Sequence, residues 1–278
     1  MTKSINDQLL EIYYFVDECL QHHPQFAQWR TSNNGAPKFS DAEVITIALM
    51  QGYFGCATLR RSYDLVRANA RSAFPHLCSY QQWLARLHAL SPLVGLLVVA
   101  SSVRPDEELQ LFRMDSKPIP VCHPLRHGRV QLLRQDGAYF SKGTKGWFFG
   151  FKLHAIVNQH GLIVGALLTP ANTDDRDAAP ALAWATEGGL CLADWGYRGE
   201  EVQDLLLEEA DLLLLTTAEA GDKRALVCSL RERVETTFSQ LWQRFVDRVF
   251  SRSWNGLWTT IKLKLLHLNL CLNGIIEA

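Results

Sequence analysis

Apolar residues recur at helical spacing through the first hundred residues of the chain and at strand-like spacing after them. The run VITIALM follows Ser40 to Glu43, and the run WLARLHAL follows Ser79 to Gln82. In both places a serine stands three residues before a Glu or Gln, the spacing at which two side chains cap the first turn of a helix. The pattern predicts a helical domain over residues 1–103, which ends at the polar segment RPDEE.

After this boundary the apolar runs become short and turn residues separate them. The runs LQLFRMDSKPIPV, RVQLLR, WFFGFKLHAIV and LIVGALLTP are predicted to be extended, because prolines and glycine-containing turns interrupt them. There follow a helix around APALAWATE, the strand GLCLADWG, a helix from Glu200 to Ala210, the strand DLLLLTT and a long helix from about Ser229. This order predicts an α/β domain over residues 104–278, with helices on the faces of a mixed sheet.

The composition is that of a globular protein without a membrane segment. The chain has 278 residues, nearly half of them apolar, which is enough for one large domain or for one medium domain with a smaller partner, with a real core. Its first residues are too polar for a secretory signal and no apolar run reaches membrane-spanning length, so we expect a cytoplasmic location. None of the seven cysteines has the paired spacing of a zinc or redox site. For the small cluster of Cys122, His123 and His127, ordinary loop packing is favoured over zinc.

The formal net charge of −1 hides a segregation of charge along the chain. Residues 113–152 hold eight Lys/Arg and two Asp/Glu, residues 174–222 hold two and thirteen, and residues 223–278 hold nine and four. Phosphate binding depends on the local potential and not on the net sum, so the two basic tracts are compatible with a DNA partner. Solvated surface charge is the other interpretation of each tract.

Three acidic residues stand where catalytic carboxylates could meet. Asp115 is placed at the end of the first predicted strand, Asp194 at the end of a later one, and Glu235 beside the apolar stripe of the last helix. Converging carboxylates repel unless a cation lies between them, and Mg²⁺ prefers such oxygen ligands. Two ions about 3.5 to 4 Å apart can activate an attacking oxygen and stabilise a leaving one at phosphorus. Acids are common in globular chains, so this pattern by itself is weak evidence.

The residues around these acids resemble a known family. The strings EVITIAL, MDSKPIPVCH, GFKLHAIVNQHGLIVGALLTPANTDD, LADWGYRG and RERVETTFSQL resemble the DDE transposases of bacterial insertion sequences, most closely the nine-eight-two group. The resemblance runs from about Ser40 almost to the C-terminus. It implies an RNase H-like catalytic domain, a mixed five-stranded sheet with flanking helices, behind an all-α DNA-binding domain.

The resemblance also implies a function and its cofactor. Asp115, Asp194 and Glu235 take the places of the catalytic, metal-binding triad, which uses Mg²⁺ and for which Mn²⁺ would substitute. The implied activity is two-metal cleavage and strand transfer of insertion-sequence ends by a homodimer. The implied partner is double-stranded DNA, as terminal inverted repeats and as target. A nuclease of the same fold without strand transfer and a catalytically silent DNA-binding regulator are the alternatives.

Residues close to the triad are candidates for supporting roles. Strand alternation puts Lys152 and His154 on one face, from which both could approach the metal site if their strand neighbours that of Asp115. Lys152 is interpreted as a phosphate ligand, and His154 either as a substrate-orienting group or as a structural histidine. Asn172 and Asp175 match a family-like stretch near the site, although both residue types also serve turns.

The remaining candidates are cations and one aromatic residue that could bind DNA. They are Lys117, Arg198, Arg231, Arg60, Arg67, Arg71 and Trp147. The arginines of the N-terminal domain share one predicted helix face, which could equally be an ordinary solvated surface. Trp147 could stack on an unpaired base at the cleavage point, although burial is the commoner fate of an aromatic ring. Lys117 and Trp242 depart from the family pattern, which has an aromatic and a basic residue at those places.

Overall fold

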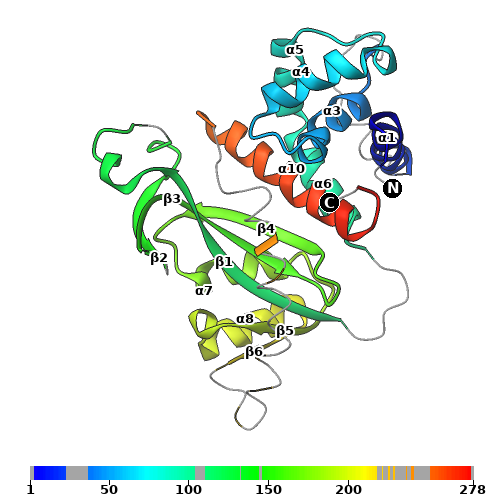
Figure 1. Ribbon diagram of the computed structural model, residues 1–278. Coiled ribbons are helices and arrows are strands. Elements are labelled where there is room, and N and C mark those ends of the chain that lie inside the picture. The colour runs from blue at the N-terminus through cyan, green and yellow to red at the C-terminus, as the bar shows by residue number, and fades with distance from the viewer. Residues whose placement is uncertain are drawn as a thin grey trace. The chain divides into compact units, whose positions relative to one another are not determined.

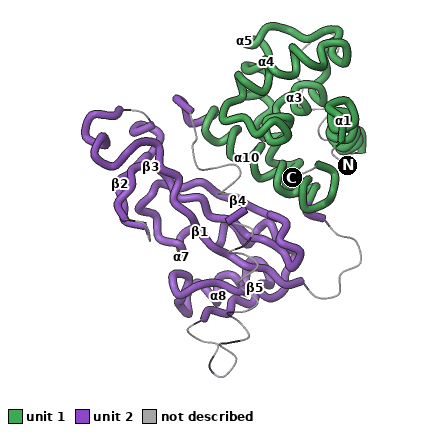
Figure 2. The backbone as a smooth tube through the Cα atoms, in the orientation of Figure 1, with its two compact units in different colours: residues 1–101, 255–278 green, residues 102–254 purple. Residues whose placement is uncertain are grey.

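The computed structural model describes residues 3–22, 37–103, 110–131, 133–143, 146–217 and 251–276, together with residues 221, 225, 228, 236, 239 and 240. The chain divides into two compact units, one of residues 1–101 with 255–278 and the other of residues 102–254 (Figure 2). Glu235, Arg231 and the helix expected from about Ser229 lie outside the described residues, apart from isolated positions.

The regular elements described in the first unit are helices (Figure 1). They are α1 (Ile5–His22), α3 (Asp41–Tyr53), α4 (Leu59–Asn69), η1 (Arg71–Ala73), α5 (Tyr80–Ala89), α6 (Ser91–Ala100) and α10 (Trp254–Leu272). Both predicted capping boxes are confirmed, with Ser40 and Ser79 as the N-cap residues of α3 and α5. Among the described helices none alone is long and apolar enough to cross a membrane; only α5 with α6, across a bend of 59°, reaches that length.

Helix α10 belongs to the first unit, although the second domain was expected to run to residue 278. Its side chains are buried on most sides, as Leu257, Ile261 and Leu268 show. Lys262 and Asn269 donate hydrogen bonds to main-chain carbonyls of α6, at Ser91 and Val98. A helix that is apolar nearly all round needs neighbours on every side, and the N-terminal helices provide them.

The second unit is built on a six-stranded mixed sheet, one strand more than expected. Its elements are β1 (Leu111–Cys122), η2 (Pro124–Arg126), β2 (Tyr139–Gly143), β3 (Gly146–Val157), β4 (Ile163–Pro170), α7 (Asp175–Ala183), β5 (Gly189–Ala193), η3 (Trp195–Tyr197), α8 (Glu200–Ala210) and β6 (Leu212–Thr216). The strand order is β2-β3-β1-β5-β6, and β4 pairs with β3. The pairs among β1 to β4 are antiparallel, whereas β5 is parallel to both β1 and β6.

The run RVQLLR was predicted as a strand, and this prediction is wrong. The chain instead makes the 3-10 helix η2 and a series of turns, in which Leu133 adopts a left-handed conformation with φ of 60°. The Arg134 guanidinium donates to the carbonyls of His127 and Val130 and so holds these turns together. The strand that pairs with β3 comes later, as β2.

The two faces of the sheet carry different residues. Helices α7 and α8 cover one face, where Met114 of β1, Ile156 of β3 and Cys191 of β5 lie in a continuous apolar core. A smaller cluster forms around Leu192 with neighbours that include Leu111. Because side chains alternate along a strand, β1 divides into Phe112 and Met114 on the helix-covered face and Leu111, Arg113 and Asp115 on the opposite face.

Candidate active site

Asp115 and Asp194 stand at equivalent positions on two neighbouring parallel strands. The last paired residues of β1 and β5 are Arg113 and Leu192, and each aspartate follows two residues later. Parallel neighbours lie about 4.8 Å apart, so the register brings the two carboxylates to the same end of the strand pair. Asp194 also adds to the raised pKa of Asp115, as expected of two like charges close together.

Asp115 lies within β1 and not at its end, which differs from the predicted position. The strand continues to Cys122 as the partner of β3 alone, so Pro118 and Pro120 fall beyond the last residue that pairs with β5. Prolines are tolerated there because they remove no hydrogen bond to β5. β1 therefore loses its second neighbour after Arg113, two residues before Asp115.

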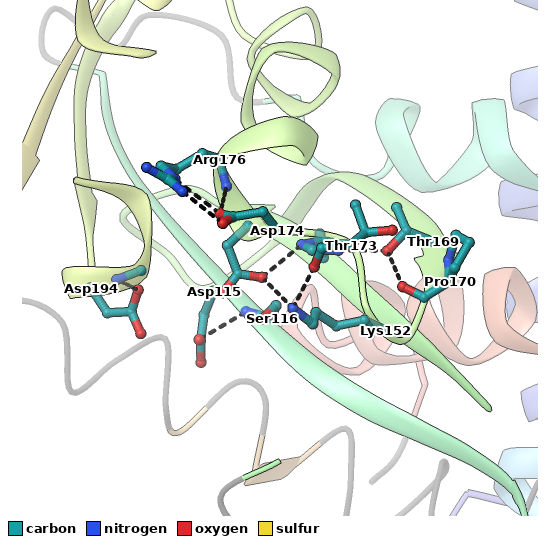
Figure 3. A network of polar contacts seen from close by, with 12 residues as sticks. Asp115, Ser116, Lys152, Thr169, Pro170, Thr173, Asp174, Arg176 and Asp194 are labelled. Atoms are coloured by element: carbon teal, nitrogen blue, oxygen red, sulfur yellow. Dashed lines mark hydrogen bonds and ion pairs between the residues drawn. The ribbon is translucent and has the colours of Figure 1, made fainter. Parts of the chain in front are cut away.

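Burial dominates the electrostatics of Asp115. The residue is 8% exposed, and this burial raises the pKa of its carboxyl, while Lys117 and the Ser116 N–H lower it. The Ser116 N–H donates to one carboxylate oxygen at 2.8 Å, as Figure 3 shows. The Lys117 Nζ lies 3.3 Å from the other. Lys117, placed among the DNA-binding candidates, therefore contacts one of the two aspartates directly.

Asp194 opens the turn that follows β5. It is the N-cap of η3, and its Oδ1 accepts a hydrogen bond from the Gly196 N–H at 2.9 Å. A Cβ on Gly196 would lie 3.0 Å from Asp194 Oδ1 and 3.1 Å from Asp175 Oδ2. Glycine at this position allows the two carboxylates to approach the same small space.

Asp175 at the start of α7 is held by Lys152 and lies close to His154. The Lys152 Nζ donates to Asp175 Oδ1 at 3.0 Å and to the Thr173 carbonyl at 2.8 Å. The His154 Nδ1 lies 3.4 Å from the same Asp175 oxygen, and its Nε2 lies 2.8 Å from Thr169 Oγ1. Burial lowers the pKa of His154 to about 4, so the imidazole is neutral at pH 7.

Lys152 and His154 project toward the helix-covered face and not toward the face of Asp115. The strand β3 does neighbour β1, but the register pairs Asp115 with Ala155 and Ser116 with His154. Residues paired across two strands point to the same side of the sheet. These two side chains contact Asp175, and Asp175 in turn lies close to Gly196 in the turn of Asp194.

Tyr197 is the residue of this region that the sequence analysis did not single out. Its ring is fully buried in the core under α7 and α8, and its hydroxyl has no hydrogen-bond partner among the described residues. Burial, followed by Asp175, Asp115 and Asp194, raises the pKa of Tyr197 well above its ordinary value. The phenol therefore stays protonated and can act only as a donor toward these aspartates. The signal was present in the string LADWGYRG, which places Tyr197 three residues after Asp194.

The other candidates in the second unit lie at the surface. The exposed Arg198 stacks over the ring of Trp195, with 4.4 Å from its Cζ to the ring centre. Asn172 is exposed in the turn before α7. Trp147, at the start of β3, is 57% exposed and eight residues from Ala155, the residue that pairs with Asp115. That spacing corresponds to about 25 Å along a strand, so Trp147 does not lie beside the aspartates.

The three candidate arginines of the first unit do not form one helical row. Arg60 and Arg67 are exposed on α4, but the helix ends at Asn69 and Arg71 begins the 3-10 helix η1. The Arg60 guanidinium pairs with Asp64 at 2.8 Å, and that of Arg71 donates to the Phe74 carbonyl. Two of these arginines therefore already have protein partners.

The chemistry of the aspartate pair fits a divalent cation. Two carboxylates, one within β1 and one directly after the neighbouring β5, supply the hard oxygen donors that Mg²⁺ takes from a protein, and a cation would offset their repulsion. In the described part of the chain, no group of three or more His, Cys, Asp or Glu is arranged to hold a metal ion. His123 and His127 instead belong to the turns around η2, where His123 Nδ1 accepts from Leu125 and the His127 ring stacks on Phe140.

Comparison with protein families identifies the second unit. Residues 107–245, half of the chain, match the model of the transposase DDE domain. The chain belongs to this family. The matched range contains the three acids of the predicted triad, and the resemblance to DDE transposases is confirmed at this level. The search of curated proteins found no match to this transposase.

Proposed function

We propose that this transposase cuts and joins the DNA ends of an insertion sequence, with divalent metal ions held by Asp115, Asp194 and Glu235. The observation that supports the proposal most directly is the equal register of the two aspartates on β1 and β5, inside the range of the family match. Glu235 is included in the proposed triad because of its position in the string RERVETTFSQL.

We assign the second unit to the RNase H-like fold on the same grounds. An antiparallel set of strands leads through β1 into the parallel strands β5 and β6, with α7 and α8 on one face. Asp115 lies on β1, and Asp194 directly follows the neighbouring strand β5. The family's nine-eight-two group remains our prediction for this chain.

The chain's own residues would bind and orient the scissile phosphate. Asp115 and Asp194 would hold Mg²⁺, or Mn²⁺ in its place, and the bound cations would supply activation of the attacking oxygen and stabilisation of the leaving one. Lys117 forms an ion pair with Asp115 and would contact a phosphate oxygen once its carboxylate partner binds metal. Asp175, fixed by Lys152, would keep the turn after β5 in place.

A cleavage assay with the intact chain tests the proposal. The substrate is duplex DNA from both sides of the coding sequence, with Mg²⁺ or EDTA present. The parent chain is expected to cleave only with the metal, and Asp194→Asn is expected to lower the rate at least about a hundredfold, because it removes a carboxylate charge from the site.

The matched control is Asp177→Asn, which removes an exposed acid from the first turn of α7, outside the aspartate pair. This variant should cleave at the parent rate. Circular dichroism of both variants checks that the fold is retained. Equal cleavage by Asp194→Asn and Asp177→Asn would overturn the assignment.

Strand transfer is tested separately with pre-cleaved ends. Supplying a free 3′-hydroxyl and a target plasmid should give joined products in the presence of Mg²⁺, since water and a DNA hydroxyl are alternative nucleophiles for the same displacement. Cleavage without any joined product would favour the nuclease, and neither reaction would favour the DNA-binding regulator. Binding of the same ends by gel shift distinguishes that regulator from a misfolded preparation.

A further inference from the structure

Three rings form a stack at the end of the sheet where β2 meets β3. The His127 ring lies 4.4 Å from that of Phe140, and Phe140 lies 5.1 Å from Trp147, with the last two rings parallel within 4°. The three side chains come from the turns after η2, from β2 and from β3. Trp147 ends the series and is 57% exposed, so part of its ring is open to a ligand.

Three cations lie next to the residues of this stack, in sequence or across the strand pair. Arg126, Arg129 and Lys142 are exposed, and in the described part of the chain they make no side-chain hydrogen bond or ion pair. Lys142 is the direct cross-strand partner of Trp147. Between Ser116 and Phe151 the sequence holds a single acid, Asp136. A flat aromatic ring beside unpaired cations complements a nucleotide, which presents a flat base and a negative phosphate.

The stack is separate from the aspartate pair. Trp147 lies about 25 Å along β3 from the residue that pairs with Asp115, a length of about seven base pairs of duplex. The ring is too far away to touch the phosphate between the aspartates. It can contact DNA only at a distance from the bond that is cut.

We propose that the open face of Trp147 binds an unpaired base of single-stranded DNA, with Arg126, Arg129 and Lys142 on its phosphates. This proposal rests on the proposed function for its choice of DNA as ligand. The DNA base would stack on Trp147 and become the fourth ring of the stack formed by His127, Phe140 and Trp147. The surface thus holds single-stranded DNA several nucleotides away from the cleavage site.

The test is equilibrium binding by the full chain in EDTA, with no cleavage. The probes are a fluorescein-labelled mixed-sequence oligonucleotide and the same sequence as a complete duplex. Trp147→Ala is expected to weaken binding of the single strand about tenfold and to change duplex binding less than twofold, because only an unpaired base can stack. Trp147→Phe keeps a ring and should retain most of the affinity.

Trp184→Ala is the matched control, since Trp184 is 76% exposed and lies at the C-terminal end of α7. It should bind both probes like the parent chain. Arg129→Gln is expected to weaken both probes and to lower the salt slope by about one unit. The proposal is overturned if Trp147→Ala and Trp184→Ala bind the single strand equally well. It is also overturned if Trp147→Ala loses the same affinity for the single strand and for the duplex. Because no metal is used, a chain that cleaves but fails here contradicts this inference alone, and a chain that passes here but never cleaves contradicts the proposed function alone.

Discussion

Tyr197 buries a hydroxyl group close to the three aspartates. Its hydroxyl is fully buried, and among the described residues it donates to no acceptor, although Asp175, Asp115 and Asp194 act on it electrostatically. A buried donor without an acceptor costs about 1 to 3 kcal/mol relative to its hydrated state. The ring itself packs in the apolar core and contributes stability through burial.

We therefore expect Tyr197→Phe to stabilise the metal-free protein by about 1 kcal/mol or more, because it removes the unpaired hydroxyl and keeps the ring. Urea unfolding at pH 7 in EDTA measures the change. The control is Tyr63→Phe, since the buried Tyr63 hydroxyl donates to the Cys78 carbonyl at 2.5 Å. That variant should lose about 1 kcal/mol. A loss of stability in both variants would contradict the prediction.

The sequence indicates which residues are candidates for the site better than it indicates toward which face of the sheet their side chains point. The pattern of apolar runs predicts Asp115 and Asp194 at the ends of two strands, and the structure shows that these strands are neighbours in which the two residues have the same register. His154 was expected to be able to approach the metal site if its strand neighbours that of Asp115; the strands are neighbours, but the register pairs Asp115 with Ala155, and a shift of one residue in pairing reverses the face of every side chain. Strand register depends on contacts with the neighbouring strands. The sequence of one strand does not reveal these contacts.

Helix α10 buries a charge. Lys264 is 8% exposed, and burial lowers the pKa of its ammonium to about 8 from an ordinary value of 10.5. The unfolded chain therefore holds this proton more tightly than the folded one. Stability should rise as the pH increases from about 8 to 10.5, and at pH 7 the buried charge costs about 3 kcal/mol.

Lys264→Met should remove this cost. We expect the free energy of unfolding at pH 7 to increase by up to about 3 kcal/mol, with a gain that shrinks above pH 8 and disappears near pH 10.5. Thermal or urea unfolding across this pH range measures it. Lys142→Met, at an exposed position of β2, should show neither the gain nor its pH dependence. A gain that does not change with pH would assign the effect to packing alone.

Whole elements were predicted well where the local pattern is strong. The helix from Glu200 to Ala210 is confirmed as α8, and the strand DLLLLTT as β6. The region after β1 was not, because Pro124, the left-handed Leu133 and the hydrogen bonds of Arg134 produce turns that an apolar run does not reveal. Long-range contacts also decide that α10 joins the N-terminal helices, which chain order alone did not indicate.

The division of the chain into units predicts the effect of shortening it. The first unit consists of residues 1–101 and 255–278, so a chain that ends at residue 254 lacks the helix on which the N-terminal helices pack. We expect helices α1, α3, α4, α5 and α6 to become sensitive to limited proteolysis in this variant, while strands β1 to β6 and helices α7 and α8 stay protected. A chain that ends at Ile276 retains α10 and should resist like the parent. Equal protection of these N-terminal helices in both truncated chains would contradict this expectation.

The interleaved order of the two units also affects how the protein is made. The N-terminal helices leave the ribosome first, but the helix that completes their core follows only after about 150 further residues, which at about 5 to 20 residues per second takes about 10 to 30 s. During that interval their apolar surfaces are open to solvent and to other nascent chains. The sheet is contiguous in sequence and can fold during this interval. The yield of native protein should therefore depend on chaperones that cover the apolar surfaces of the N-terminal helices until α10 is synthesised.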